Sequence, residues 1–423
     1  MTQSMRKGVE QIDWAAVRPV ALDAALAAVA LVVLGWLKLH PGLDWREEAQ
    51  PAVHALLAGH VHSFLTLAPI YGASLVLRAP FLLATKLSHS GDLAVYRASA
   101  IPCLMATGAL AVWLSAQMRV KGSSTVARVL VLLVCAANPL IMWALKWGHP
   151  EELLSAAFCV AAVLCALRER SIAAAVLLGL AIANKEWAVL ATGPVLVALP
   201  RARIRTLLIA GGVAAALMAP FMLATAGFTG QVKAVGTGTG TIFHPWQIWW
   251  FFGSFPHPHP GLFVFDPNFV YRLPPSWLGG LGHSLVVVLM PVLTALYGLV
   301  RHPRAGRARQ DALLLLALLL ALRCMLDPWD ISYYWLPFLF ALLAWEVVST
   351  RRAPMMSLVA TAVAAWTLQN HFAFDTQAAV FLVVSVPSLL ALAVAVYAPD
   401  AGRRILAVSR RVAAPPEPAP ASS

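Results

Sequence analysis

The most constraining feature of the sequence is its succession of long apolar runs separated by short polar loops. Hydrophobic residues make up 60% of the 423 residues and charged residues only 12%, and the mean hydropathy is +0.75. Soluble domains are only about 45–50% apolar. Runs of about 20 apolar residues are long enough to cross a bilayer as helices, which satisfy their own backbone hydrogen bonds. The sequence therefore predicts an all-α polytopic membrane protein and excludes a soluble globular domain.

Segments of about 17–25 residues give about twelve predicted transmembrane helices. They lie near residues 20–39, 98–118, 128–145, 151–167, 171–183, 187–200, 206–225, 284–300, 311–326, 332–348, 354–370 and 377–398. The first run continues past any small-residue cleavage site, so we expect an uncleaved span. Residues 68–87 are also apolar, but a further span there would invert every later basic loop. We therefore predict juxtamembrane helices in this first outer loop.

Basic residues test this topology, because cytoplasmic loops are rich in Lys and Arg. Of the 31 basic residues, 21 fall in the alternate loops that the topology assigns to the inside, so both termini are predicted to be cytoplasmic. The excess of Arg over Lys and the abundant Ala are typical of a GC-rich bacterial genome, which favours a bacterial plasma membrane. The basic clusters are dispersed between apolar runs, so we predict no nucleic-acid partner.

The chain divides into five predicted regions. Its long outer segment carries an aromatic run and a Pro/His stretch with His257 and His259, which we interpret as solvated loop histidines. Twelve of the 15 tryptophans fall on or near the outer side, which favours an outward-facing site built from aromatic platforms. The regions are a cytoplasmic N-terminus (1–19), a transmembrane module with catalytic outer loops (20–225), an aromatic outer loop (226–283), a second transmembrane module (284–398) and a disordered cytoplasmic tail (399–423).

Polar clusters interrupt the apolar pattern at the outer ends of four predicted spans. Charges cost about 2.5–3.5 kcal/mol each at a bilayer centre, so charged residues at the ends of otherwise apolar helices suggest a function. The helical hairpin predicted over 147–187 brings two of the clusters together on one face of the membrane. The clusters comprise Asp44; His149, Glu151 and Glu152; Asn184 and Lys185; and Arg323, Asp327 and Asp330.

These groups suit the attack of an acceptor hydroxyl on a sugar that a lipid phosphate carries. Asp44 is the predicted general base, and Lys185 the predicted partner of the departing phosphate. Because a phosphodiester is a fair leaving group, one base suffices, and direct displacement inverts the anomeric carbon. Candidate contacts for the donor or acceptor sugar are His149, Asn184, Trp187, His244, Trp246, Asp327 and Asp330.

Several short motifs follow one another in the first half of the chain. They are an acidic residue early in the first outer loop, the entry YRASA into the next span, the acidic loop WGHPEELL and a helical pair that meets at GLAIANKEW. Their order resembles the GT-C superfamily of integral-membrane glycosyltransferases, and most closely the bacterial polyprenyl-phosphate-mannose-dependent mannosyltransferases. The resemblance covers about residues 20–225.

The resemblance implies transfer of a sugar, mannose by analogy, from a polyprenyl-phosphate donor to a glycolipid or glycan acceptor on the extracytoplasmic face. It implies that Asp44 is the catalytic base, that Glu151 or Glu152 is the second acidic position, and that Lys185, with Arg323, faces the donor phosphate. Many relatives have Asp where this chain has Glu. Whether a divalent cation binds there is therefore left open, and nothing in the sequence demands one.

Each singled-out group also has a simpler interpretation. Asp44 can cap the helix that follows it, and Glu151 and Glu152 can be first-turn acids favoured by the helix dipole. Lys185 can extend to the membrane surface, and Arg323 can form a structural ion pair with the nearby aspartates.

Two other classes of function fit the predicted topology. Twelve spans with both ends inside is also the layout of secondary transporters and of flippases for lipid-linked sugars. Transporters of that kind show two similar halves and polar sites near the midplane, whereas this sequence shows no internal repeat and places its polar clusters at the outer surface. A non-catalytic membrane scaffold is the third interpretation.

Overall fold

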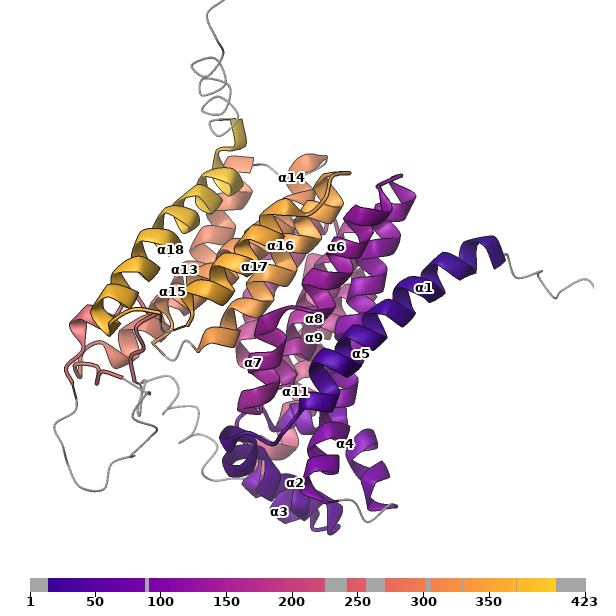
Figure 1. Cartoon of the computed structure of the whole chain (residues 1–423), viewed down its shortest axis with the longest axis vertical. Helices are drawn as coiled ribbons and strands as arrows, with labels where there is room; N and C mark the ends of the chain where they lie inside the picture. The colour runs from indigo at the N-terminus through magenta and orange to yellow at the C-terminus, as the bar shows by residue number, and fades with distance from the viewer. Residues whose placement is uncertain are drawn as a thin grey trace, which may run out of the picture.

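The computed structural model describes residues 14–87, 91–224, 242–255, 271–301, 306–328, 331–369 and 371–400. Within these ranges the chain forms helices, and the only extended pairings are two isolated bridges, Phe243 with Arg272 and Ser254 with Leu273. The predicted all-α class is therefore confirmed for the described residues. Figure 1 shows the helices as an elongated bundle, with the first module beside the second.

The helices are given in chain order, where η marks short 3₁₀ or π turns. They are α1 (Trp14–Ala30), η2 (Leu31–Gly35), η3 (Trp36–Lys38), η4 (Trp45–Ala49), α2 (Gln50–Leu57), α3 (Val61–Leu67), α4 (Gly72–Lys86), α5 (Asp92–Val120), α6 (Thr125–Ala136), α7 (Pro139–Trp147), α8 (Glu151–Leu167), α9 (Ser171–Asn184), η5 (Glu186–Ala191), α10 (Thr192–Ala198), α11 (Arg203–Ala224), η6 (Trp250–Phe252), α13 (Gly279–Arg301), α14 (Arg307–Gln310), α15 (Ala312–Leu326), η7 (Ser332–Trp335), α16 (Leu336–Ser349), α17 (Met355–Thr367) and α18 (Phe374–Tyr397).

Seven helical segments among the described residues are long and apolar enough to cross a membrane. They are Pro19–Lys38, Asp92–Val120, Thr125–Trp147, Arg203–Ala224, Ser284–Arg301, Ser332–Ser349 and Phe374–Tyr397. Each of the other five predicted spans also contains a helix, but α8, α9 and α15 have only 17, 14 and 15 residues. Most side chains of α8 and α15 are buried. A helix that is apolar on all sides is expected at the centre of a bundle, so protein rather than lipid surrounds much of these two.

Several helix boundaries differ from the predicted ones by a few residues. Helix α5 begins at Asp92, ahead of the expected start near residue 98, and runs for 29 residues. The expected span over 128–145 lies within the one candidate span Thr125–Trp147, but its helix is interrupted between α6 and α7, because the Asn138 side chain accepts a hydrogen bond from the Leu140 amide and Pro139 takes the first position of α7. Asn at the N-cap and Pro at the first helical position both favour a new helix start.

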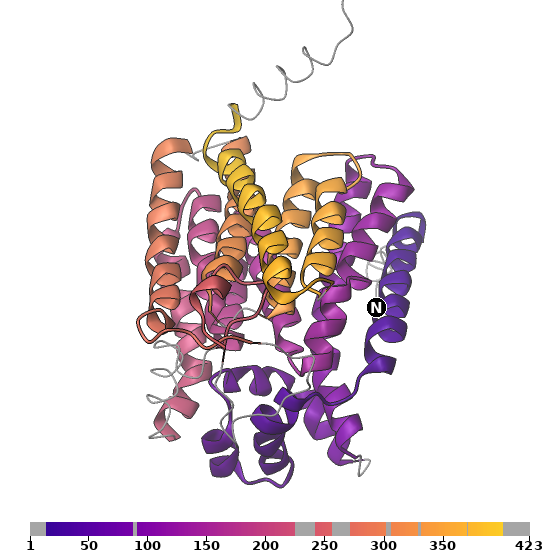
Figure 2. The same ribbon diagram turned by 60° about the vertical axis from the view of Figure 1, so that its left-hand side comes forward.

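The first outer loop forms α2, α3 and α4, which lie together at one end of the bundle (Figures 1 and 2). Helix α4 spans only 15 residues and is not among the seven segments long enough to cross a membrane. It packs against α5, α9 and α11. The predicted helices in this loop are therefore present, and α4 is too short to span, whereas their position at the membrane surface stays a prediction.

Two basic residues of the described inner loops, Lys121 and Arg309, make contacts at the opposite end of the bundle. Lys121 Nζ donates a hydrogen bond to the Val347 carbonyl at 2.6 Å. Arg309 donates to the Ala198 carbonyl at 3.0 Å and pairs with Glu169 at 3.1 Å. These contacts join loops from both modules, and all of the joined loops are ones that the sequence assigns to the inside. The described outer loop with α2–α4 and these inner loops thus lie at opposite ends of the bundle (Figure 1). Which end faces the cytoplasm stays a prediction.

Candidate active site

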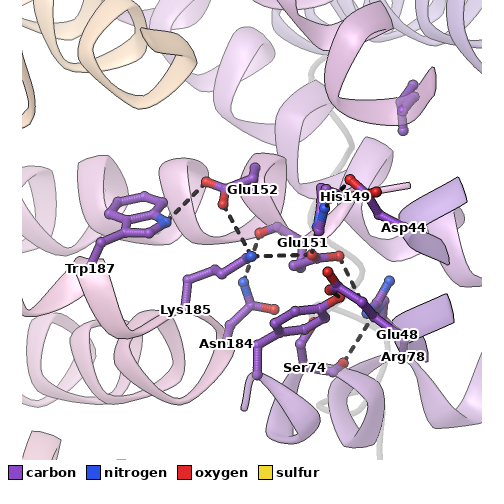
Figure 3. Close-up of polar contacts among 12 residues, drawn as sticks. Asp44, Glu48, Ser74, Arg78, His149, Glu151, Glu152, Asn184, Lys185 and Trp187 are labelled. Atoms are coloured by element: carbon purple, nitrogen blue, oxygen red, sulfur yellow. Dashed lines mark hydrogen bonds and ion pairs between the residues drawn. The ribbon is translucent and has the colours of Figure 1, made fainter. Parts of the chain in front are cut away.

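His149 lies between two carboxylates from different parts of the chain. Its Nε2 is 3.1 Å from Asp44 Oδ2, and its Nδ1 is 2.8 Å from Glu151 Oε1. Asp44 precedes η4, His149 lies in the α7–α8 loop, and Glu151 opens α8 (Figure 3). The Asp44 side chain makes no capping hydrogen bond, so its interpretation as a helix cap is wrong. It is 24% exposed, whereas the side chains of His149 and Glu151 are buried.

Lys185 continues this network into the protein. Its Nζ lies 3.4 Å from Glu151 Oε1 and 3.2 Å from Glu152 Oε1, and 4.2 Å from the centre of the Tyr71 ring. Burial lowers the pKa of Lys185, but the Glu152 and Glu151 carboxylates outweigh burial and raise it above the usual value. Its side chain is only 7% exposed, so the interpretation that it extends to the surface is wrong. Two carboxylates already balance its charge.

The two first-turn glutamates are fully buried. They do occupy the first turn of α8, where the helix dipole favours them, but they also hold the cations of the network. Asn184, the last residue of α9, donates Nδ2–H to the Glu151 carbonyl at 2.7 Å. This bond fixes the end of α9 to the start of α8, as expected for the two ends of one hairpin.

Trp187 links the network to the second module. Its Nε1 donates to Glu152 Oε2 at 3.0 Å, and the Arg323 guanidinium carbon lies 5.1 Å from the centre of its ring. Arg323 Nε is 3.6 Å from Asp327 Oδ2, which agrees with the structural ion-pair interpretation. Arg323 Nη1 is nevertheless buried without a hydrogen-bond partner. The guanidinium therefore has a donor that the protein does not use.

His244 and Trp246 belong to a neighbouring segment rather than to the chain of contacts from Asp44 to Asp327. Their rings stack at 4.9 Å with an angle of 7° between planes, and burial lowers the pKa of His244 to about 4. The segment is held at the end of α15, where Gln247 Nε2 donates to the Pro328 carbonyl at 3.2 Å. Three residues singled out in the sequence, Asp330, His257 and His259, lie outside the described residues.

The structure adds residues that sequence reasoning missed. Arg78 on α4 is completely buried, with Nη2 3.5 Å from Glu151 Oε2. Tyr71 donates its hydroxyl to Glu48, and the Tyr333 ring stacks on His149 at 5.4 Å. The sequence alone could have singled out Arg78, because it is the only charged side chain within the apolar run 68–85 and charges inside such runs are costly. No sequence pattern marks the two tyrosines.

The sequence suggested that the outer tryptophans form open aromatic platforms. Several of them are instead buried. Trp45, Trp187 and Trp250 are only 1%, 6% and 0% exposed, whereas Trp277 and Trp366 are 60% and 45% exposed. The first three pack within the protein, so they cannot present a free face to a sugar ring without rearrangement. The platform interpretation is wrong for these three residues.

No group of three or more His, Cys, Asp and Glu side chains in the described part of the chain has an arrangement that could hold a metal ion. The carboxylates of the network instead bind Lys185, Arg78 and His149. The structure also contains an apolar cavity of about 540 Å³ between α15, α16, α17 and α18, which Trp335, Phe338 and Trp345 help to line.

Glycine permits the close approach that brings Asp44 to His149. Gly148 has φ +112°, and a Cβ at this position would lie 2.5 Å from the Trp45 amide nitrogen. We expect Gly148→Ala to lower the free energy of unfolding by more than the ~1–3 kcal/mol of a strained backbone and to separate the two side chains. Gly59→Ala is the matched control, since Gly59 has φ +83° with nothing within 4 Å. Thermal unfolding in detergent compares the two variants, and equal losses would contradict the steric argument.

The sequence matches no family model, and no curated protein matches it. The GT-C family suggested by the motifs is therefore carried forward as a resemblance.

Proposed function

We propose that the protein is an integral-membrane glycosyltransferase of GT-C type with about twelve spans and both termini in the cytoplasm. It moves a sugar, mannose by resemblance, from a polyprenyl-phosphate donor to a glycolipid or glycan acceptor at the extracytoplasmic face. The observation that carries the proposal is Asp44, a 24% exposed carboxylate at the outer end of a buried charged network. A base needs access to its substrate and fixed neighbours, and Asp44 has both.

Asp44 accepts the proton of the acceptor hydroxyl in this proposal. Its Oδ2 faces His149, which leaves Oδ1 for the hydroxyl. The hydroxyl oxygen attacks the anomeric carbon as its proton passes to Asp44, and the bond from that carbon to the phosphate oxygen breaks with its electron pair on the phosphate. Direct displacement inverts the anomeric carbon.

The departing phosphate gains negative charge, which cations stabilise. Lys185 is linked to Asp44 through Glu151 and His149. Its positive charge is already paired with the carboxylates of Glu151 and Glu152. Arg323 has an unused donor in Nη1, and we therefore assign the departing phosphate to Arg323, with Lys185 as the second cation. The Tyr334 ring lies under the guanidinium at 4.2 Å and precedes Trp335 of the apolar cavity. This proximity supports a donor whose phosphate carries an apolar chain.

The test is a transfer assay with purified protein in liposomes. Polyprenyl phosphates that carry labelled mannose, arabinose or glucose are supplied together with a lipid extract as acceptor. We expect one label to leave the donor and to appear on an acceptor with inverted anomeric configuration. Movement of the intact labelled donor across the bilayer, with no transfer, would replace the enzyme by a flippase. Retention of all labels on donors that stay in their original leaflet would refute both functions.

A further inference from the structure

We propose that His149 is a positioning residue for the Asp44 carboxylate, held in place by Glu151 from its other side. The proposal rests on the function proposed above and deepens it, because it assigns a role to a side chain that need not touch the substrate. Figure 3 shows His149 between the two carboxylates.

Both ring nitrogens of His149 face carboxylate oxygens. The separations are 3.1 Å from Nε2 to Asp44 Oδ2 and 2.8 Å from Nδ1 to Glu151 Oε1. An ionised carboxylate only accepts hydrogen bonds, and a neutral imidazole has only one N–H. Both bonds form together only when the ring carries a proton on each nitrogen. His149 is therefore an imidazolium that donates to Asp44 and to Glu151.

The ring has little freedom to turn. It is 6% exposed, it stacks on Tyr333 at 5.4 Å with 29° between planes, and Tyr71 meets it edge-on at 5.9 Å. The titratable groups that face it come from five parts of the chain: Asp44 before η4, Tyr71 before α4, Glu151 on α8, Lys185 after α9 and Tyr333 on η7. A fixed donor orients Oδ2 of Asp44 and thereby directs Oδ1 away from the ring.

The electrostatics agree with this geometry. Burial lowers the pKa of His149, but the hydrogen bonds to Asp44 and Glu151 outweigh burial and raise it from 6.5 to about 9. The folded pKa thus lies above the unfolded one. The stability that these bonds contribute is fully present below pH 6.5 and is lost as the pH rises through about 9. The rate of sugar transfer should fall over the same upper range, because a neutral ring releases one of the two carboxylates.

The first experiment measures the protonation state of the His149 ring directly. Protein labelled with ¹⁵N-histidine in nanodiscs is titrated by NMR, and His149→Gln assigns the signal. We expect both nitrogens of His149 to be protonated at neutral pH, with a titration midpoint near 9. Asp44→Asn should lower this midpoint by about one pH unit or more, because an adjacent carboxylate is lost. If His149→Gln does not fold, the signal that moves in Asp44→Asn provides the assignment. A ring that is neutral at pH 7 and indifferent to Asp44→Asn would overturn the proposal.

The second experiment measures transfer against pH. We expect His149→Gln to lower kcat by about 10–100-fold with little change in KM, and to abolish the decline near pH 9. His54→Gln is the matched control, because His54 also faces a carboxylate, Asp92 at 3.0 Å, but is 49% exposed. It should retain the wild-type rate and pH profile. An unaltered profile in His149→Gln would refute the positioning role, whereas a wild-type protein that transfers no sugar would refute the glycosyltransferase itself while the NMR titration still decides the link to Asp44.

Discussion

Asp44→Asn is expected to fold as the wild type and to lose sugar transfer by about 10²–10⁴-fold, the usual contribution of a general base. Asparagine preserves the size of the side chain and can still accept a hydrogen bond from His149 through its amide oxygen. It has no carboxylate to take the proton of the acceptor hydroxyl. The rate is measured with the labelled donor that the wild type uses, and folding is followed by thermal unfolding and by the elution profile in detergent.

Asp92→Asn is the control for this variant. Asp92 also faces a histidine, but its side chain is 59% exposed and it stands at the start of α5. We expect its transfer rate to stay within about twofold of the wild type, because exposed ion pairs contribute little. Full transfer by Asp44→Asn would remove Asp44 as the base, and an equal loss in both variants would point to a general effect of outer-end charge.

Lys185→Met is expected to destabilise the protein by about 3–5 kcal/mol, because removal of one partner leaves buried charge without compensation. Lys185 Nζ stands between Glu151 and Glu152, and both carboxylates are 1% exposed. Methionine fills similar space but supplies no charge. Arg78 remains beside Glu151, so most of the loss should arise at Glu152. The measurement is the thermal unfolding midpoint in detergent, together with the yield of folded protein.

A charge-balanced variant separates electrostatics from packing. Glu152→Gln combined with Lys185→Met removes one charge of each sign, so the double variant should be more stable than Lys185→Met alone. Glu169→Gln is the surface control, since Glu169 pairs with Arg309 while 62% exposed, and its effect should stay below about 1 kcal/mol. A double variant as unstable as the sum of the two single ones would show that the Lys185–Glu152 pair is not coupled.

The sequence predicted the meeting of the α8 and α9 polar ends because hairpin geometry is local. Two apolar runs joined by a short charged turn must return to the same face, and the Asn184–Glu151 hydrogen bond is the observed result. The link to Asp44 was also predictable in outline, since all outer loops lie at one end of a bundle. The pairing of individual charged groups was not predictable. A contact such as that of His149 with two carboxylates depends on distances in space that spacing along the sequence does not determine.

Longer-range partners were missed for a related reason. Arg78 reaches Glu151 through the packing of α4 on α5 and α9, and Tyr333 reaches His149 from the second module. Neither contact leaves a periodic trace in the chain. Hydropathy also could not distinguish lipid-facing spans from short apolar helices surrounded by protein. It predicts about twelve spans, whereas seven segments of the described residues have the necessary length and composition.

The shortness of α9 has a consequence for how substrates arrive. Its 14 residues rise only about 21 Å, whereas the hydrocarbon core of a bilayer is about 30 Å thick. If α9 starts at the inner boundary of that core, Lys185 lies about 9 Å below the outer one. The proposed active site would then be a recess beneath the level of the phospholipid headgroups. A sugar tethered to a membrane anchor can enter such a recess sideways from the lipid, whereas a sugar nucleotide dissolved in water would have to descend into it from above.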